Sequence, residues 1–322
     1  MKKLKNILIP LGVLCALACA DPSPPKKRPD HSATNPPAKE EGRSYHLVWE
    51  EQFTGPALDE KTWNIEQVEN PQNNEYQAYT KENLRIAPEP LSGRSCLVIT
   101  ARKENHGNRH FTSARLNTMK KVAFQYGRID ALIKLPPTSN GLWPAFWMKG
   151  NDNDLAPWPS CGEIDIMEMG HIDGISAGTQ DRYLGNACHW GPNSAALRSQ
   201  SSKTTLSYSL QDNDFHLYTL LWDKDFISIY VDLDRFPDRA PYYRFPHRAN
   251  ANNAVSYFNK PFYILLNLAV GGTYTGITGS ANMEQVTGLN AENGYEANMY
   301  VDYIRIYQKK EDGGKMINAQ HQ

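Results

Sequence analysis

The sequence has few cysteines, and this scarcity excludes two classes of protein. Only five of the 322 residues are cysteine, and only three of these, Cys96, Cys161 and Cys188, lie beyond residue 20. Three cysteines cannot form the disulfide framework of a small secreted domain, and their spacing matches no zinc site. We expect buried thiols, with a single disulfide as the alternative.

An excess of charge of one sign is also missing. Lysine and arginine number 34, and aspartate and glutamate number 35. A nucleic-acid-binding surface needs a basic field, and a polycationic partner needs an acidic one. We therefore expect no nucleic-acid partner and a neutral or weakly charged ligand.

The longest apolar run lies at the N-terminus and is short. Residues 7–18 are apolar and follow a basic start, Met1–Lys5. About a dozen apolar residues are too few to cross a bilayer and are typical of a secretory signal peptide, here residues 1–19. Ala16–Cys19 resembles a bacterial lipoprotein cleavage box. This predicts an exported protein with Cys19 acylated and anchored to the outer membrane, on the cell surface or the periplasmic face. Simple secretion is the alternative.

Composition divides the rest of the chain into three parts. Residues 20–44 are rich in Pro, Lys and Ser, cannot bury a core, and predict a flexible tether. Residues 45–310 suit one large domain, which we expect to be a monomer, and residues 311–322 predict a polar tail. We find no internal repeat.

Short alternating or β-branched segments predict an all-β domain with little helix. The clearest are residues 97–101, 127–135, 217–222, 226–232 and 299–307. Segments of this length, separated by turns, predict a sandwich of two antiparallel sheets.

Three acids alternate with large apolar residues over Glu163–Glu168, in the order Glu-Ile-Asp-Ile-Met-Glu. Alternate residues of a strand share a face, so Glu163 and Asp165 point the same way. Glu168 breaks this alternation, and we infer a β-bulge near Ile166-Met167 that returns it to the same face. Three acids on a strand can be a solvated face, but the apolar residues between them favour a buried, chemically active group.

Two neighbouring carboxylates can hydrolyse a glycosidic bond. In a retaining glycosidase they lie roughly 5–5.5 Å apart, one as nucleophile and the other as acid and then base. We predict Glu163 as the nucleophile, oriented through Asp165. Glu168, beside that negative charge, is predicted to hold its proton and to serve as the acid.

This stretch resembles the catalytic signature of glycoside hydrolase family 16, in its laminarinase-like branch with the extra bulge residue. Five other segments resemble the family in the same order: 74–80, 124–129, 141–148, 266–272 and 301–307. The resemblance covers about residues 45–308. It implies a jelly-roll β-sandwich with an open concave cleft, endo-acting retaining hydrolysis of an oligo- or polysaccharide, and no required cofactor.

Aromatic residues near the motif are candidates for sugar binding, because their flat faces stack on pyranose rings. Trp143 and Trp147 share a face if their segment is extended, and Trp158 precedes Glu163 by five residues. The resemblance implies that tryptophans at these places shape the subsites. Packing in the core is the alternative for each.

The resemblance supplies three further candidates. His189 would hydrogen-bond the substrate or the acid, unless it is structural. Asn74 lies in a segment that matches a loop at the cleft edge. Asp302 matches a position that helps to bind a structural calcium in some relatives, and a surface aspartate explains it equally well.

The region between Gly170 and Trp190 departs from glucan-cleaving relatives. Gln180, Asp181 and Arg182 make it more polar than a glucan cleft needs. It is similar to gut-bacterial members that cleave N-acetyllactosamine chains of mucin and keratan type. This favours an endo-β-1,4-galactosidase whose Gln180 and Arg182 contact substrate. The alternative is an endo-β-1,3- or mixed-linkage glucanase. Transglycosylation shares the same intermediate, and a non-catalytic surface glycan-binding protein is a lesser alternative, because no acid is lost.

Overall fold

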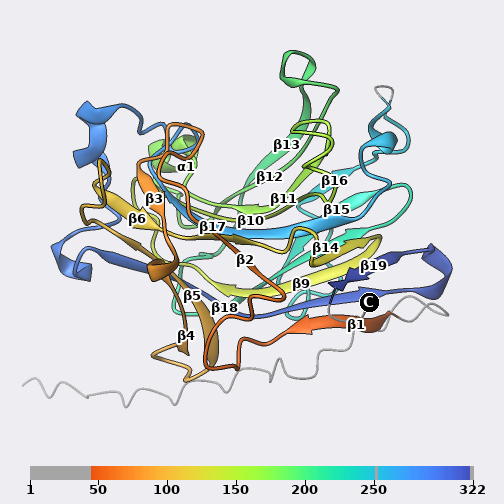
Figure 1. Ribbon diagram of the computed structural model, residues 1–322, viewed down its shortest axis with the longest axis horizontal. Helices are drawn as coiled ribbons and strands as arrows, with labels where there is room; N and C mark the ends of the chain where they lie inside the picture. Colours follow the sequence, from red (N-terminus) through yellow and green to blue (C-terminus); the bar gives the residue numbers. More distant parts are fainter. Residues whose placement is uncertain (1–44, 251–252, 320–322) are drawn as a thin grey trace, which may run out of the picture. The chain divides into compact units, whose positions relative to one another are not determined.

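The computed structural model describes residues 45–250 and 253–319, which form two layered β-sheets (Figure 1). The predicted all-β class is confirmed. The predicted signal peptide and tether, with Cys19, lie outside the described residues. Within the described ranges, no helix is long and apolar enough to cross a membrane.

The first sheet has the strand order β16-β15-β14-β9-β18-β5-β6-β3, with β1 on β18 and β4 on β5. The β3–β6 pair is parallel, and the other pairs of this sheet are antiparallel. Its strands are β1 (His46–Glu51), β3 (Gln77–Tyr79), β4 (Leu84–Pro88), β5 (Ser95–Arg102), β6 (Phe111–Ser113), β9 (Gly127–Lys134), β14 (His216–Trp222), β15 (Ile227–Val231), β16 (Tyr243–Phe245) and β18 (Glu296–Gln308).

The second sheet has the order β13-β12-β11-β10-β17-β7-β2, with β8 joining β17 to β19. Its strands are β2 (Asn64–Glu66), β7 (Arg115–Asn117), β8 (Val122–Gln125), β10 (Leu142–Gly150), β11 (Glu163–Glu168), β12 (Tyr183–Trp190), β13 (Arg198–Thr205), β17 (Phe262–Val270) and β19 (Lys315–Asn318).

Helix is confined to short segments in the connections of the described chain. They are α1 (Ile172–Ser176) and the 3₁₀ turns η2 (Lys81–Asn83), η3 (Ser194–Ala196), η4 (Ala254–Ser256), η5 (Ser280–Gln285), η6 (Ala291–Asn293) and η7 (Lys310–Asp312). All five strands predicted from the alternation are present, as β5, β9, β14, β15 and β18.

The C-terminal segment differs from the prediction. β19 pairs with β8 from Lys315 opposite Gln125 to Asn318 opposite Val122. Met316 packs against the main core, so the residues expected to be a polar tail add a strand to the second sheet. The folded unit therefore extends past residue 310.

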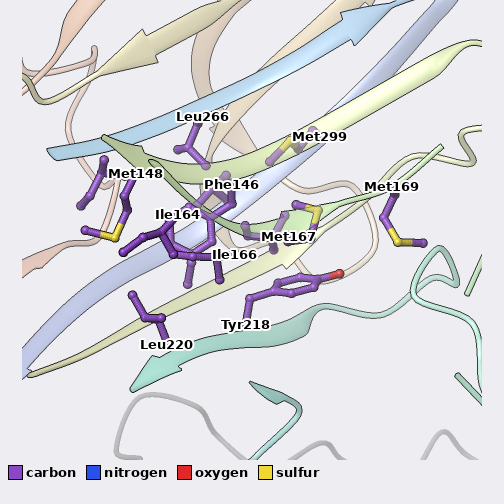
Figure 2. Packing of buried hydrophobic residues seen from close by; sticks show 14 of the residues in the cluster. Phe146, Met148, Ile164, Ile166, Met167, Met169, Tyr218, Leu220, Leu266 and Met299 are labelled. Atoms are coloured by element: carbon purple, nitrogen blue, oxygen red, sulfur yellow. The ribbon is translucent and has the colours of Figure 1, made fainter. Parts of the chain in front are cut away.

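The hydrophobic core lies between the two sheets. Figure 2 shows Ile164, Ile166 and Met167 of β11 pointing toward Tyr218 and Leu220 of β14. Because β11 gives its apolar side chains to this core, its polar side chains must lie on the opposite side, which we call the outer face of the second sheet.

The three cysteines of the described chain are free and buried, as expected. Burial raises the pKa of the Cys161 thiol to about 11 and that of Cys96 to about 12. These thiols therefore stay protonated at neutral pH and serve as small apolar core residues.

Candidate active site

The acids of β11 share the outer face because the strand carries a bulge. Asp165 lies opposite Trp147 and Met167 opposite Phe146, which leaves Ile166 as the extra residue. The inferred bulge is therefore present. Ile166 and Met167 are both fully buried, and Glu168 returns to the face of Glu163 and Asp165.

The neighbouring strand β10 brings a tryptophan and a lysine to the same face. Lys149 lies opposite Glu163 and Trp147 opposite Asp165. Trp147 Nε1 donates to Asn267 Oδ1 of β17 at 2.8 Å, and the Lys149 ammonium lies 5.4 Å from the centroid of the Trp147 ring. The indole is thus fixed on the outer face and is only partly buried.

His189 approaches the acids from β12, on the other side of β11. It lies opposite Glu163 in register, and its Nε2 is 3.2 Å from Asp165 Oδ2. The Asp165 side chain is 8% exposed, so its charge is shielded from water. His189 therefore contacts the middle acid rather than the predicted acid/base residue.

Trp143 makes a direct contact with Glu168. Its Nε1 donates to Glu168 Oε1 at 2.9 Å, and its ring stacks on Tyr274 with centroids 4.8 Å apart. The sequence predicted a sugar platform at Trp143. The structure shows an indole whose polar edge is already occupied by a carboxylate.

Burial and, as the second cause, the charge of Asp165 together raise the pKa of Glu168 to about 8. The hydrogen bond from Trp143 acts in the opposite direction but is the smaller effect. The sequence predicts that the charge of Glu163 holds the proton on Glu168. Burial is the larger cause, and Asp165 is the more important charge.

Burial and, as the second cause, the charge of Asp165 together raise the pKa of Glu163 to about 7. For Asp165 burial again raises the pKa to about 7, and the nearby Lys149 ammonium opposes the rise. The same ammonium lowers the pKa of Glu163. The Lys149 ammonium thus favours the ionised form of Glu163, which a nucleophile requires, while burial and the charge of Asp165 favour the protonated form of Glu168, which an acid requires.

Among the described residues, Glu163, Asp165 and His189 form one group whose donor atoms all lie within 4.8 Å of one another. Such a group could hold a metal ion. However, His189 Nε2 lies 3.2 Å from Asp165 Oδ2, so these two side chains already interact with each other. A retaining glycosidase works with carboxylates alone.

Trp158 and Asn74 lie at two edges of this face. Among the described residues Trp158 Nε1 has no hydrogen-bond partner of ordinary geometry, but it lies near enough to Glu163 to favour the ionised carboxylate and so to lower its pKa slightly. A catalytic contact that is loose before substrate binds can tighten afterwards. Asn74 is exposed in a turn, and the carbonyl of its neighbour Asn73 accepts from the Thr273 amide at 2.8 Å. This joins its loop to the segment after β17.

Gln180 and Arg182 are not brought to the acids by any contact of the structure. Gln211 Nε2 donates to the main-chain carbonyl of Gln180 at 2.8 Å, and Arg182 pairs with Asp181 at 3.3 Å. Leu206 and Leu210 donate their amides to this same segment. The main chain of this segment is therefore held by the loop after β13, while the assignment of the Gln180 and Arg182 side chains to substrate recognition stays a prediction.

Asp302 lies in β18 of the first sheet and is ion-paired with Arg94. Its side chain is 13% exposed. Calcium would have to compete with this guanidinium for the carboxylate oxygen. No group of His, Cys, Asp and Glu that could hold a metal includes Asp302 within the described ranges.

Three residues near the acids were missed by the sequence analysis: Lys149, Asn267 and Tyr274. Lys149 could have been found, because it continues the alternation of Trp143 and Trp147. Asn267 faces outward on β17, between core residues. Tyr274 gives no periodic signal, because it lies in the loop after β17.

Comparison with known proteins agrees with this geometry. The family model described as glycosyl hydrolases family 16 matches residues 63–286. That range includes β11 and each outer-face residue named above.

Curated relatives include two glucan-cleaving enzymes. The chain is 31% identical to the beta-glucanase of Rhodothermus marinus, over 82% of this chain and 85% of that protein. It is also 31% identical to glucan endo-1,3-beta-glucosidase A1 of Niallia circulans, over 82% of this chain but only 38% of that longer protein. A third relative, the keratan-sulfate endo-1,4-beta-galactosidase of Sphingobacterium multivorum, is 28% identical over 60% of this chain and 39% of that protein.

Solved structures include a family 16 protein of Bacteroides ovatus, described with mixed-linkage glucan and bound to a product. It is 38% identical, has a TM-score of 0.70, and the match covers 81% of this chain and all of that one. A structure described with endo-acting O-glycanases of the human gut microbiota is 28% identical, with a TM-score of 0.65, over 84% of this chain and 92% of that one.

Proposed function

We propose that this chain, which belongs to glycosyl hydrolase family 16, is an endo-acting retaining β-glucanase that cleaves β-1,3- or mixed-linkage glucan. The observation that carries the reaction type is the presence of Glu163, Asp165 and Glu168 on one face of a bulged strand, with raised pKa values. The substrate class is supported by the Bacteroides ovatus structure, which shares 38% identity over its whole chain.

The proposed reaction uses two steps. An oxygen of ionised Glu163 attacks the anomeric carbon while the bond to the leaving sugar breaks, and Glu168 gives its proton to the leaving oxygen. Glu168, now ionised, takes a proton from water as that water attacks the glycosyl ester on Glu163. The product keeps the β configuration, and Glu168 regains its proton.

Asp165 and His189 support the first step in this proposal. Asp165 lies between the two reacting acids in sequence, and its charge raises both of their pKa values. Its contact with His189 at 3.2 Å fixes its orientation. Lys149 moderates the negative charge of Glu163 and Asp165, so that Glu163 can ionise.

An endo-β-1,4-galactosidase acting on N-acetyllactosamine chains is the second candidate. It is supported by the 28% identity to the keratan-sulfate enzyme and to the O-glycanase structure. We place it behind the glucanase because these two proteins match this chain at 28% identity, whereas the beta-glucanase of Rhodothermus marinus matches at 31% and the Bacteroides ovatus structure at 38%. A non-catalytic glycan-binding role is disfavoured by the retention of all three acids.

Product analysis separates these functions. The purified protein is incubated with laminarin, mixed-linkage β-glucan, keratan-type chains and mucin O-glycans, and the products are analysed by mass spectrometry and by NMR of the new anomeric centre. We expect glucose oligomers with an initial β anomer. Oligosaccharides with galactose at the new reducing end would establish the galactosidase instead, and an initial α anomer would contradict retention.

Export and lipid anchoring at Cys19 are proposals from the sequence alone. Their test is labelling of the intact protein with a radioactive fatty acid in a Gram-negative host, followed by separation of membranes. We expect label and membrane association in the wild type and loss of both in Cys19→Ser. Unlabelled, soluble wild-type protein would favour simple secretion.

A further inference from the structure

We propose that Tyr274 is a positioning residue that holds the acid/base Glu168 with its proton-bearing oxygen turned to the substrate. This inference rests on the proposed function and assigns a role to a loop residue outside the sheet. It is carried by the contacts of Tyr274 with Trp143 and with Glu168 itself.

The first step concerns the two oxygens of Glu168. Oε1 accepts a hydrogen bond of 2.9 Å from Trp143 Nε1. An indole N–H can only donate, so it favours the oxygen that carries no proton. When Glu168 is protonated, the proton therefore belongs on Oε2, the oxygen that does not accept from the indole, and the proposal gives this oxygen the transfer to the leaving group.

The second step concerns the orientation of the indole. Trp143 and Tyr274 stack with centroids 4.8 Å apart and an angle of 10° between their planes. At this distance the flat Tyr274 ring blocks rotation of the Trp143 indole. This keeps Trp143 Nε1 directed at Glu168 Oε1. Removal of the Tyr274 ring would leave Trp143 without a partner on that side.

Tyr274 also reaches the main chain of Glu168. Its hydroxyl donates to the Glu168 carbonyl at 3.4 Å, and it lies so close to β12 that a Cβ at Gly185 would be 2.1 Å from the hydroxyl oxygen. Gly185 lies opposite Glu168 in register. The space for the tyrosine hydroxyl thus exists only because this strand position has no side chain.

The loop that carries Tyr274 is itself held in place. The Tyr274 carbonyl accepts from the Ile172 amide at 3.1 Å, and Gly272 donates to the Ile277 carbonyl at 2.9 Å. His171 packs edge-on against the Tyr274 ring, with centroids 4.7 Å apart. Because burial and the charge of Glu168 raise the pKa of Tyr274, its hydroxyl remains a donor while the acid titrates.

The test uses aryl β-glycosides of a laminari-oligosaccharide that differ in their leaving group. A 2,4-dinitrophenolate departs without help from an acid, whereas phenolate or a sugar needs the proton. For Tyr274→Ala we expect kcat/KM to fall by less than about 3-fold with dinitrophenolate and by about 10–100-fold with phenolate or a sugar, since general acid catalysis is worth roughly 10²–10⁴-fold. Tyr274→Phe keeps the ring and should retain most of the activity.

The pH profile gives a second measurement that a purely structural role would not change. In Tyr274→Ala the basic limb of the pH profile of kcat/KM should move to higher pH. The reason is that the hydrogen bond from Trp143, which lowers the pKa of Glu168, loosens. Tyr300→Ala on β18 is the control for loss of a partly buried tyrosine, and thermal unfolding checks that each variant is folded. Equal losses with all leaving groups and an unchanged pH profile would overturn the inference. A wild type that hydrolyses none of the glycosides would instead overturn the proposed function.

Discussion

The buried acids of the first sheet and the acids of β11 differ in their partners. Asp130 pairs with Arg128 at 2.7 Å, and Glu89 pairs with Lys134 at 2.8 Å. These pairs are almost inaccessible to water, and the hydrogen bonds to Glu89 lower its pKa to about 2 against the effect of burial. Each negative charge there has a positive charge beside it.

On β11 three acids share far less positive charge. His189 contacts Asp165, and Lys149 lies near Glu163, but burial dominates and raises all three pKa values. Buried carboxylates without matched cations cost stability. A buried acid with a matched cation stabilises the fold. A buried acid without one indicates the site where protons are transferred.

The largest effect should come from removing the nucleophile. Glu163→Gln should lower kcat by roughly 10⁴-fold or more, because neither Asp165 nor Glu168 can take over the role of the nucleophile. The measurement is hydrolysis of laminarin and mixed-linkage glucan, with the exposed Glu296→Gln on β18 as control.

The same position tests the assignment of roles. Glu163→Ala should be nearly inactive and partly rescued by azide, which would give an α-glycosyl azide from a single inversion. A β-glycosyl azide would show that another residue is the nucleophile.

The next largest effect concerns a paired acid of the first sheet. Lys134→Met leaves Glu89 buried without its cation and should lower the free energy of unfolding by about 3–5 kcal/mol. Urea denaturation measures this. The control is Lys120→Met, whose pair with Asp154 is about half exposed and should contribute no more than about 1 kcal/mol. Similar losses in both variants would contradict the comparison.

Replacement of Glu168, an acid of β11 without a matched cation, should change the free energy of unfolding in the opposite direction. The pKa of Glu168 is about 8 in the folded protein against 4.5 for the free side chain, so stability falls as pH rises from about 4.5 to about 8. Glu168→Gln removes this loss and should be more stable than the wild type at pH 8, by on the order of 1–2 kcal/mol.

Glu89→Gln is the matched control for this pH dependence. The pKa of Glu89 is lowered to about 2, so its contribution to stability is present above pH 4.5 and is lost as pH falls toward 2. The variant should therefore be destabilised most at neutral pH. Thermal unfolding at pH 3, 5 and 8 compares the two, and the same sign for both variants would refute the distinction between the two kinds of acid.

Much of this site could be predicted from the sequence because strand periodicity is local. The alternation of acid and apolar residues places Glu163 and Asp165 on one face, and the break in that alternation locates the bulge. The same rule places Trp143 and Trp147. It also applies to Lys149, which was overlooked because a lysine on a strand is usually a solvated residue.

The rest depends on contacts between distant segments, which periodicity does not encode. Tyr274 reaches Glu168 through a loop fixed by hydrogen bonds to α1 and within itself. The polarity of Gln180 and Arg182 predicts a sugar contact, but polarity alone does not tell that Gln211 holds the main chain of this segment. β19 was missed because it has four residues, and its partner β8 lies almost 200 positions earlier.

The smallest effect should come from removal of calcium. Asp302 is paired with Arg94, so its charge is already balanced, as are those of Asp130 and Glu89. We therefore expect EDTA to change Tm by less than about 2 °C, which corresponds to no more than about 1 kcal/mol for a domain of this size. Arg94→Ala is the more informative variant, because without the guanidinium the Asp302 carboxylate is available to a calcium ion. If calcium is bound at Asp302, chelation should lower Tm in the wild type as well. The same chelation should leave the cleavage pattern unchanged, because Asp302 belongs to the first sheet and the proposed catalytic acids to the second.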